Sequence, residues 1–206
     1  MRSIAKTLLA LALAVGLPMA AHAESTFTTG VGTPITATAR VDFQVTVPKI
    51  LYLRVGTGTA LANNATVNLI DFTVPAASVG NGTPVAATLA SGDLGNGSVT
   101  ARVIGNNGNV TLSSTTLGAL GNGAGDTISY GQISTAAAIL TSATALPAPA
   151  LADGATTNTT VTAVAKIVNR DAQWTYSYLN GGVVAPGTYG GVNVNNGRVT
   201  YTASMP

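Results

Sequence analysis

The sequence predicts an all-β protein built from antiparallel strands. Asn-Gly, a pair that tolerates the positive φ angles of tight hairpin turns, occurs six times, at residues 81–82, 96–97, 107–108, 122–123, 180–181 and 196–197. Short runs rich in Val, Thr, Ile and Tyr lie between these pairs, and helix signals are poor beyond the first 23 residues. This spacing of turns and runs is typical of an antiparallel sandwich or barrel.

Residues 1–23 have the pattern of a secretory signal peptide. Basic residues precede an apolar run at 8–17, and Ala21-His22-Ala23 supplies the small residues that signal peptidase reads. We expect an exported chain that begins at Glu24, with a flexible segment at 24–34 and one domain over 35–206. Because no later segment has about twenty consecutive apolar residues, we expect no membrane insertion.

Charge and cysteine content narrow the classes of partner. The whole chain has a formal net charge of +2, but two of its nine basic residues lie in the signal, which leaves seven basic and seven acidic residues. No basic cluster is present, so nucleic acid is not an expected partner. With no cysteine, the exported protein must be held together by sheet pairing, core burial or contact with neighbours.

The first expected strand, residues 35–47, is the longest. Polar and apolar residues alternate without exception, which indicates a strand with one buried face. At about 3.3 Å per residue it would reach roughly 43 Å, about twice the usual strand length. Its apolar positions are Ile35, Ala37, Ala39, Val41, Phe43, Val45 and Val47.

The remaining strands follow as shorter β-branched runs between turn signals. We expect them at residues 50–55, 66–74, 84–89, 98–104, 109–113, 127–131, 159–168, 173–178 and 197–205. The Ala-rich stretch 134–145 fits either a short helix or an apolar strand. The Pro-containing stretch that follows it indicates a loop.

Two late strands carry informative faces. Trp174, Tyr176 and Tyr178 alternate along one strand, which favours core or cross-strand packing over a sugar-binding platform. The last strand places Val199, Tyr201, Ala203 and Met205 on one face. An edge of that kind, with no later strand to cover it, is open to strand addition.

Catalytic and metal-binding residues are scarce. The single histidine, His22, lies in the signal, so the mature chain has neither imidazole nor thiol for acyl transfer or structural zinc. The aspartates are scattered, and solvated or turn-forming roles explain each of Asp42, Asp71, Asp93, Asp126, Asp153 and Asp171. We therefore predict no enzymatic activity, no metal site and no cofactor.

Two segments at the ends of the chain carry a family resemblance: residues 36–53, TATARVDFQVTVPKILYL, and residues 185–206, APGTYGGVNVNNGRVTYTASMP. The first is similar to the donor segment and first body strand of chaperone–usher fimbrial subunits, specifically their cysteine-free branch, and the second is similar to a pilin closing strand. The resemblance implies an incomplete immunoglobulin-like β-sandwich, completed by donor-strand addition from the next subunit. The partners it implies are copies of the same chain, a periplasmic chaperone and an outer-membrane usher.

Two functions stay open at this stage. The first is a structural subunit of a bacterial surface fibre, in transit through the periplasm to the cell surface, with a role in adhesion or biofilm. The second is a secreted, self-contained β-sandwich binding module, for glycans among other ligands. They differ in residues 35–47, which are either exchanged between subunits or pair within their own domain.

Overall fold

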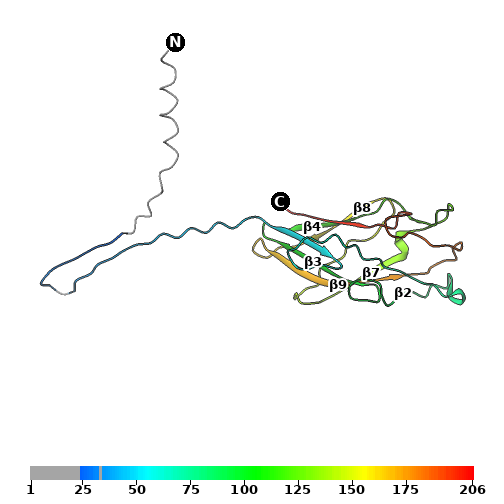
Figure 1. Cartoon of the computed structure of the whole chain (residues 1–206), viewed down its shortest axis with the longest axis horizontal. Coiled ribbons are helices and arrows are strands. Elements are labelled where there is room, and N and C mark those ends of the chain that lie inside the picture. The colour runs from blue at the N-terminus through cyan, green and yellow to red at the C-terminus, as the bar shows by residue number, and fades with distance from the viewer. Residues whose placement is uncertain (1–23, 33) are drawn as a thin grey trace, which may run out of the picture. The chain divides into compact units, whose positions relative to one another are not determined.

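Figure 1 shows a computed structural model of the protein, which describes residues 24–32 and 34–206. The expected signal peptide lies outside the described residues. The chain divides into two units, one that ends at Val47 and a compact body, Pro48–Pro206. The body therefore starts later than the single domain expected over 35–206.

The body is an antiparallel β-sandwich, which confirms the expected fold class. Its first sheet has the order β1-β3-β9-β2, with β7 also paired to β9; its second has the order β10-β4-β8, and β5 and β6 form a small separate hairpin. Figure 1 shows β4 and β8 in one layer and β3 and β9 in the other. The strands are β1 Leu51–Val55, β2 Val85–Ala86, β3 Ser98–Gly105, β4 Val110–Thr115, β5 Leu120–Gly121, β6 Thr127–Ile128, β7 Ile133–Ala138, β8 Thr156–Val161, β9 Val168–Tyr178 and β10 Thr200–Ser204.

The core lies between the two sheets and follows the period of two in the sequence. In β3, Val99, Ala101 and Val103 are buried, and they alternate with half-buried residues that face outward. In β9 the indole of Trp174 is fully buried, and its Nε1 donates a hydrogen bond to the Leu146 carbonyl at 2.8 Å. Tyr176 and Tyr178 are buried too, so the core interpretation of this aromatic face is confirmed.

The structure decides one open alternative and corrects two local expectations. Residues 134–138 belong to a strand, because β7 pairs with β9, so the strand alternative is confirmed for the start of the Ala-rich stretch. Residues 66–74 are extended but form no ladder and are not a strand. Asp171, expected in a turn between two strands, lies within β9, and the chain turns earlier through Ala165 and Lys166, both at positive φ.

Most of the Asn-Gly pairs have at least one residue in a turn or bend, residues 180–181 being the exception, and their geometry varies. Only Asn96-Gly97 has positive φ at both residues, 51° and 72°, as a type I′ turn requires. At residues 180–181 and 196–197 the asparagine alone has positive φ, and at 81–82 the glycine alone. The pair thus predicts where the chain reverses, whereas packing decides the type of turn.

One glycine supports the wall of the site described below, and its substitution gives a first prediction. Gly92 has φ +80°, and a Cβ there would lie 2.1 Å from the Ser98 carbonyl oxygen. Its N–H donates to the Leu69 carbonyl. We expect Gly92→Ala to lower the free energy of unfolding by roughly 3 kcal/mol, because strain and a backbone clash combine.

Gly82→Ala is the matched control for this prediction. Gly82 has φ +74°, but nothing lies within 4 Å of a Cβ at that position. Only the left-handed backbone is then penalised, by about 1 kcal/mol. Urea unfolding measures the free energy of unfolding of both variants. If Gly92→Ala and Gly82→Ala lost the same amount, a backbone clash at Gly92 would be contradicted.

Residues 24–32 and 34–47 are the described part of the other unit. No strand is assigned in these residues, and the hydroxyls of Thr26 and Thr28 donate to the carbonyls of Thr38 and Thr36. The Arg40 guanidinium also binds the Glu24 carboxylate through two hydrogen bonds, of 2.6 and 2.8 Å. The segment therefore turns back on itself without forming a ladder.

Candidate functional site

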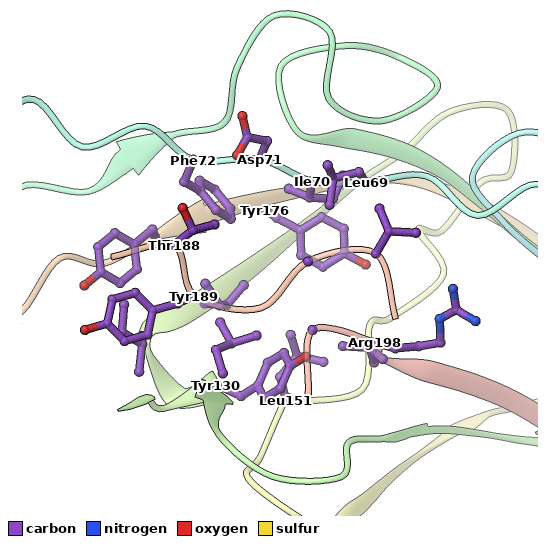
Figure 2. A pocket seen from close by; sticks show the side chains of 18 of the residues that line it. Leu69, Ile70, Asp71, Phe72, Tyr130, Leu151, Tyr176, Thr188, Tyr189 and Arg198 are labelled. Carbon is purple, nitrogen blue, oxygen red and sulfur yellow. The ribbon is translucent and has the colours of Figure 1, made fainter. Parts of the chain in front are cut away.

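One cavity of the body is an apolar groove of about 1050 Å³ (Figure 2). It is bounded by two segments far apart in the sequence, residues 66–74 and residues 184–201. Residues of β1, β3 and β9 also line it, among them Leu53, Val99 and Tyr178. We call this cavity the groove.

Residues 66–74 form one wall, and one edge of this wall is unpaired. The Leu69 and Asp71 carbonyls accept hydrogen bonds from Gly92 and Thr88, at 3.3 and 2.8 Å. Successive residues of an extended chain direct their main-chain groups to opposite sides. Ile70 and Phe72 therefore direct theirs to the other edge, where they form no hydrogen bond with any described residue.

Strand β10 contributes the opposite wall. It pairs with β4 on one edge only, and its other edge has no partner strand in the described part of the chain. Val199 and Tyr201 line the groove, while Tyr201, Ala203 and Met205 pack against the core. Tyr201 belongs to both sets, and the open edge of β10 lies beside the groove.

Three tyrosines that line the groove have hydroxyl groups that are already bonded. The hydroxyls of Tyr176 and Tyr201 are 2.9 Å apart, and the Tyr130 hydroxyl donates to the Asn196 carbonyl at 2.7 Å. Burial raises the pKa of Tyr176 and of Tyr130 to about 12, and that of Tyr201 well above its usual range. All three are neutral at physiological pH, so the interior suits an apolar occupant.

Residues 35–47 are exposed in the single chain. Phe43 is 91% exposed and Val41 70%, and no residue of the segment is in a strand. Within its own unit, the segment therefore has no buried face of the kind that the alternation predicts. Exposed apolar surface of this extent is typical of interaction surfaces.

The aspartates do not assemble into a catalytic site. Asp93 binds Arg54 at 3.0 Å, Asp126 accepts a hydrogen bond from Asn122, and Asp153 accepts one from the Tyr130 N–H. Asp171 is buried, which corrects its expected solvated role. Within residues 24–32 and 34–206, no three His, Cys, Asp or Glu side chains are grouped to hold a metal ion.

Comparisons with family models, with curated proteins and with solved structures return no match to this chain. None of the helices in the described part has the length and apolar character needed to cross a membrane.

Proposed function

We propose that this protein is a structural subunit of a bacterial surface fibre that assembles by β-strand addition. Residues 35–47 of one copy would lie in the groove of the next. The observation that carries the proposal is that one chain contains both halves of such a joint. It has an exposed alternating strand sequence and an apolar groove between two unpaired main-chain edges.

Energetics explain why the groove suits this segment better than a flat surface would. Burying Ile35, Val41, Phe43, Val45 and Val47 at roughly 2 kcal/mol each contributes about 10 kcal/mol. Ordering thirteen residues costs about 13 to 26 kcal/mol of backbone entropy, so burial alone is insufficient. Main-chain hydrogen bonds to β10 and to Ile70 and Phe72 would supply the remainder.

The resemblance at the two ends of the chain supports the finer parts of the proposal. A chaperone–usher subunit is an immunoglobulin-like sandwich that lacks one strand, and here the open edge of β10 and the unpaired main chain of residues 66–74 border a groove. A periplasmic chaperone would fill the groove before assembly. An outer-membrane usher would then direct the assembly of the subunits. The fibre would then act at the cell surface in adhesion or biofilm.

The size of the protein after refolding tests the proposal. Chain without the signal, refolded from denaturant, should form polymers that gel filtration with light scattering detects. A synthetic peptide of residues 35–47, added in excess, should bind the groove and shorten the polymers. A peptide with Asp in place of Val41 and Phe43 is the control and should have no effect.

A strictly monomeric chain that ignores the peptide would contradict the proposal. That result would favour the closed binding module, whose ligand would then be expected in the groove. The aromatic face of β9 is not available for it, because Trp174 is fully buried.

A further inference from the structure

The inference that follows rests on the proposed function and concerns how the incoming strand is aligned. The residues lining the groove include one acid, Asp71, and one base, Arg198, and no other charged residue. Residues 35–47 likewise contain one base, Arg40, and one acid, Asp42. The two halves of the joint thus carry matching single charges of each sign.

These four charges lie where they would meet. Odd residues of the 35–47 segment are apolar, so Arg40 and Asp42 share its outer, polar face, about 7 Å apart. Asp71 is exposed on one wall of the groove. Arg198 lies on the other wall, directly before Val199, which also lines the groove. Figure 2 shows Asp71 and Arg198 on opposite sides of the groove and displaced along it, with Arg198 toward β10.

Apolar burial aligns the strand only in part. A slip of two residues keeps every apolar side chain on the inner face, because the side-chain period of a strand is two. Such a slip replaces Val45 by Val47 or Ala37 by Ala39 without a change of shape, although it also moves Phe43 into the place of a valine. Charges on the polar face would oppose the same slip, because it moves Arg40 to the place of Asp42 or Asp42 to the place of Arg40, and they would add a second determinant of register.

We propose that two ion pairs across the rims of the groove, Arg40 with Asp71 and Asp42 with Arg198, fix the register and direction of the incoming strand of a second copy. Reversing the strand would exchange the positions of its two charges along the groove and place like charges together. Neither Asp71 nor Arg198 forms an ion pair within the described residues, so both are available.

Glu24 competes for one of these charges. It binds Arg40 in the single chain, and the two side chains are 42% and 82% exposed. An exposed pair of this kind is weak, so docking can exchange Glu24 for Asp71 at little cost. Glu24→Gln should therefore leave assembly intact and slightly faster.

Charge reversal tests the inference on the full mature chain. We expect Asp71→Lys to slow polymer growth after refolding by about fivefold at low salt, because rim charges act mainly on association. Adding Arg40→Asp should restore the rate to within about twofold of the unaltered chain. In 1 M NaCl, where the screening length is about 3 Å, all three rates should converge.

A control variant, a test of the second ion pair and a stability measurement separate this effect from misfolding. Asp126→Lys reverses an exposed acid that does not line the groove and should grow at the unaltered rate. Arg198→Asp with Asp42→Arg tests the second pair independently, with the same loss and restoration expected. Urea unfolding midpoints should match across all variants.

The outcomes distinguish the alignment from strand addition itself. If Asp71→Lys and Arg198→Asp polymerise at the unaltered rate at low salt, or if the exchanged pairs fail to restore it, the ion-pair alignment is wrong while strand addition stands. If the unaltered chain neither polymerises nor binds the 35–47 peptide, strand addition is rejected and the alignment with it.

Discussion

Val41→Asp is expected to abolish polymers while leaving the body folded. In the joint, Val41 would enter the groove, where an unpaired carboxylate costs several kcal/mol or forces the strand out. In the single chain the same side chain is 70% exposed and lies outside the compact body. The substitution therefore acts on assembly without a cavity or a buried charge in the subunit itself.

Thr38→Asp is the matched control, since it adds the same charge three residues away on the polar face. It should polymerise nearly as well as the unaltered chain. Gel filtration with light scattering reports assembly, and urea unfolding reports the body. Equal assembly by both variants would show that residues 35–47 do not occupy the groove. Loss of body stability in Val41→Asp would instead indicate an intramolecular strand.

The sequence predicts the central strands well because their patterns are local. In β3 and β9 apolar and polar residues alternate, and the inner sets are buried as expected. Residues 66–74 carry a similar composition, yet their hydrogen bonds between main-chain groups are isolated ones, to Thr88 and Gly92, and form no ladder. Whether an extended run joins a ladder depends on the edge that tertiary packing offers it, which composition does not encode.

The groove itself was beyond sequence reasoning. Its walls come from residues 66–74 and from residues 184–201, more than a hundred positions apart. In the sequence, each wall is an ordinary stretch, one rich in β-forming residues and one rich in glycine, and neither pattern indicates a groove. One half of the site was recognisable: a strand was predicted at residues 197–205 from its alternating apolar residues, and β10 lies there with one edge that pairs with no described strand.

Asp171 is a residue whose role the sequence did not reveal. Nothing around it in the sequence marks it, yet it accepts an extensive network of hydrogen bonds. It lies on the outer side of β9, but a loop folds over it and leaves it 5% exposed. Its Oδ1 accepts the N–H groups of Thr141 and Ser142, both at 2.9 Å, and its Oδ2 accepts the Thr141 hydroxyl. The same loop continues to Leu146, whose carbonyl holds the indole of Trp174.

We therefore expect Asp171→Ala to lower the free energy of unfolding by roughly 3 kcal/mol. The substitution leaves two backbone N–H groups in the loop without an acceptor and removes charge-assisted bonds. Asp171→Asn retains one acceptor oxygen and should lose about half as much. Asp126→Ala, at an exposed turn, should change stability by less than about 0.5 kcal/mol.

The stabilisation by Asp171 should also depend on pH. Burial disfavours its carboxylate, but the hydrogen bonds from Thr141 and Ser142 outweigh burial and lower its pKa from 3.8 to about 2. Because this pKa is lower in the folded state than in the unfolded state, the ionised carboxylate stabilises the fold by about 2 kcal/mol at pH values above the unfolded-state pKa. The contribution disappears as the pH falls from 4 to 2. The stability gap between the unaltered chain and Asp171→Asn should therefore be widest above pH 5 and shrink toward pH 2. A gap that stayed constant in urea unfolding across this range would show that the carboxylate is not held ionised by the loop.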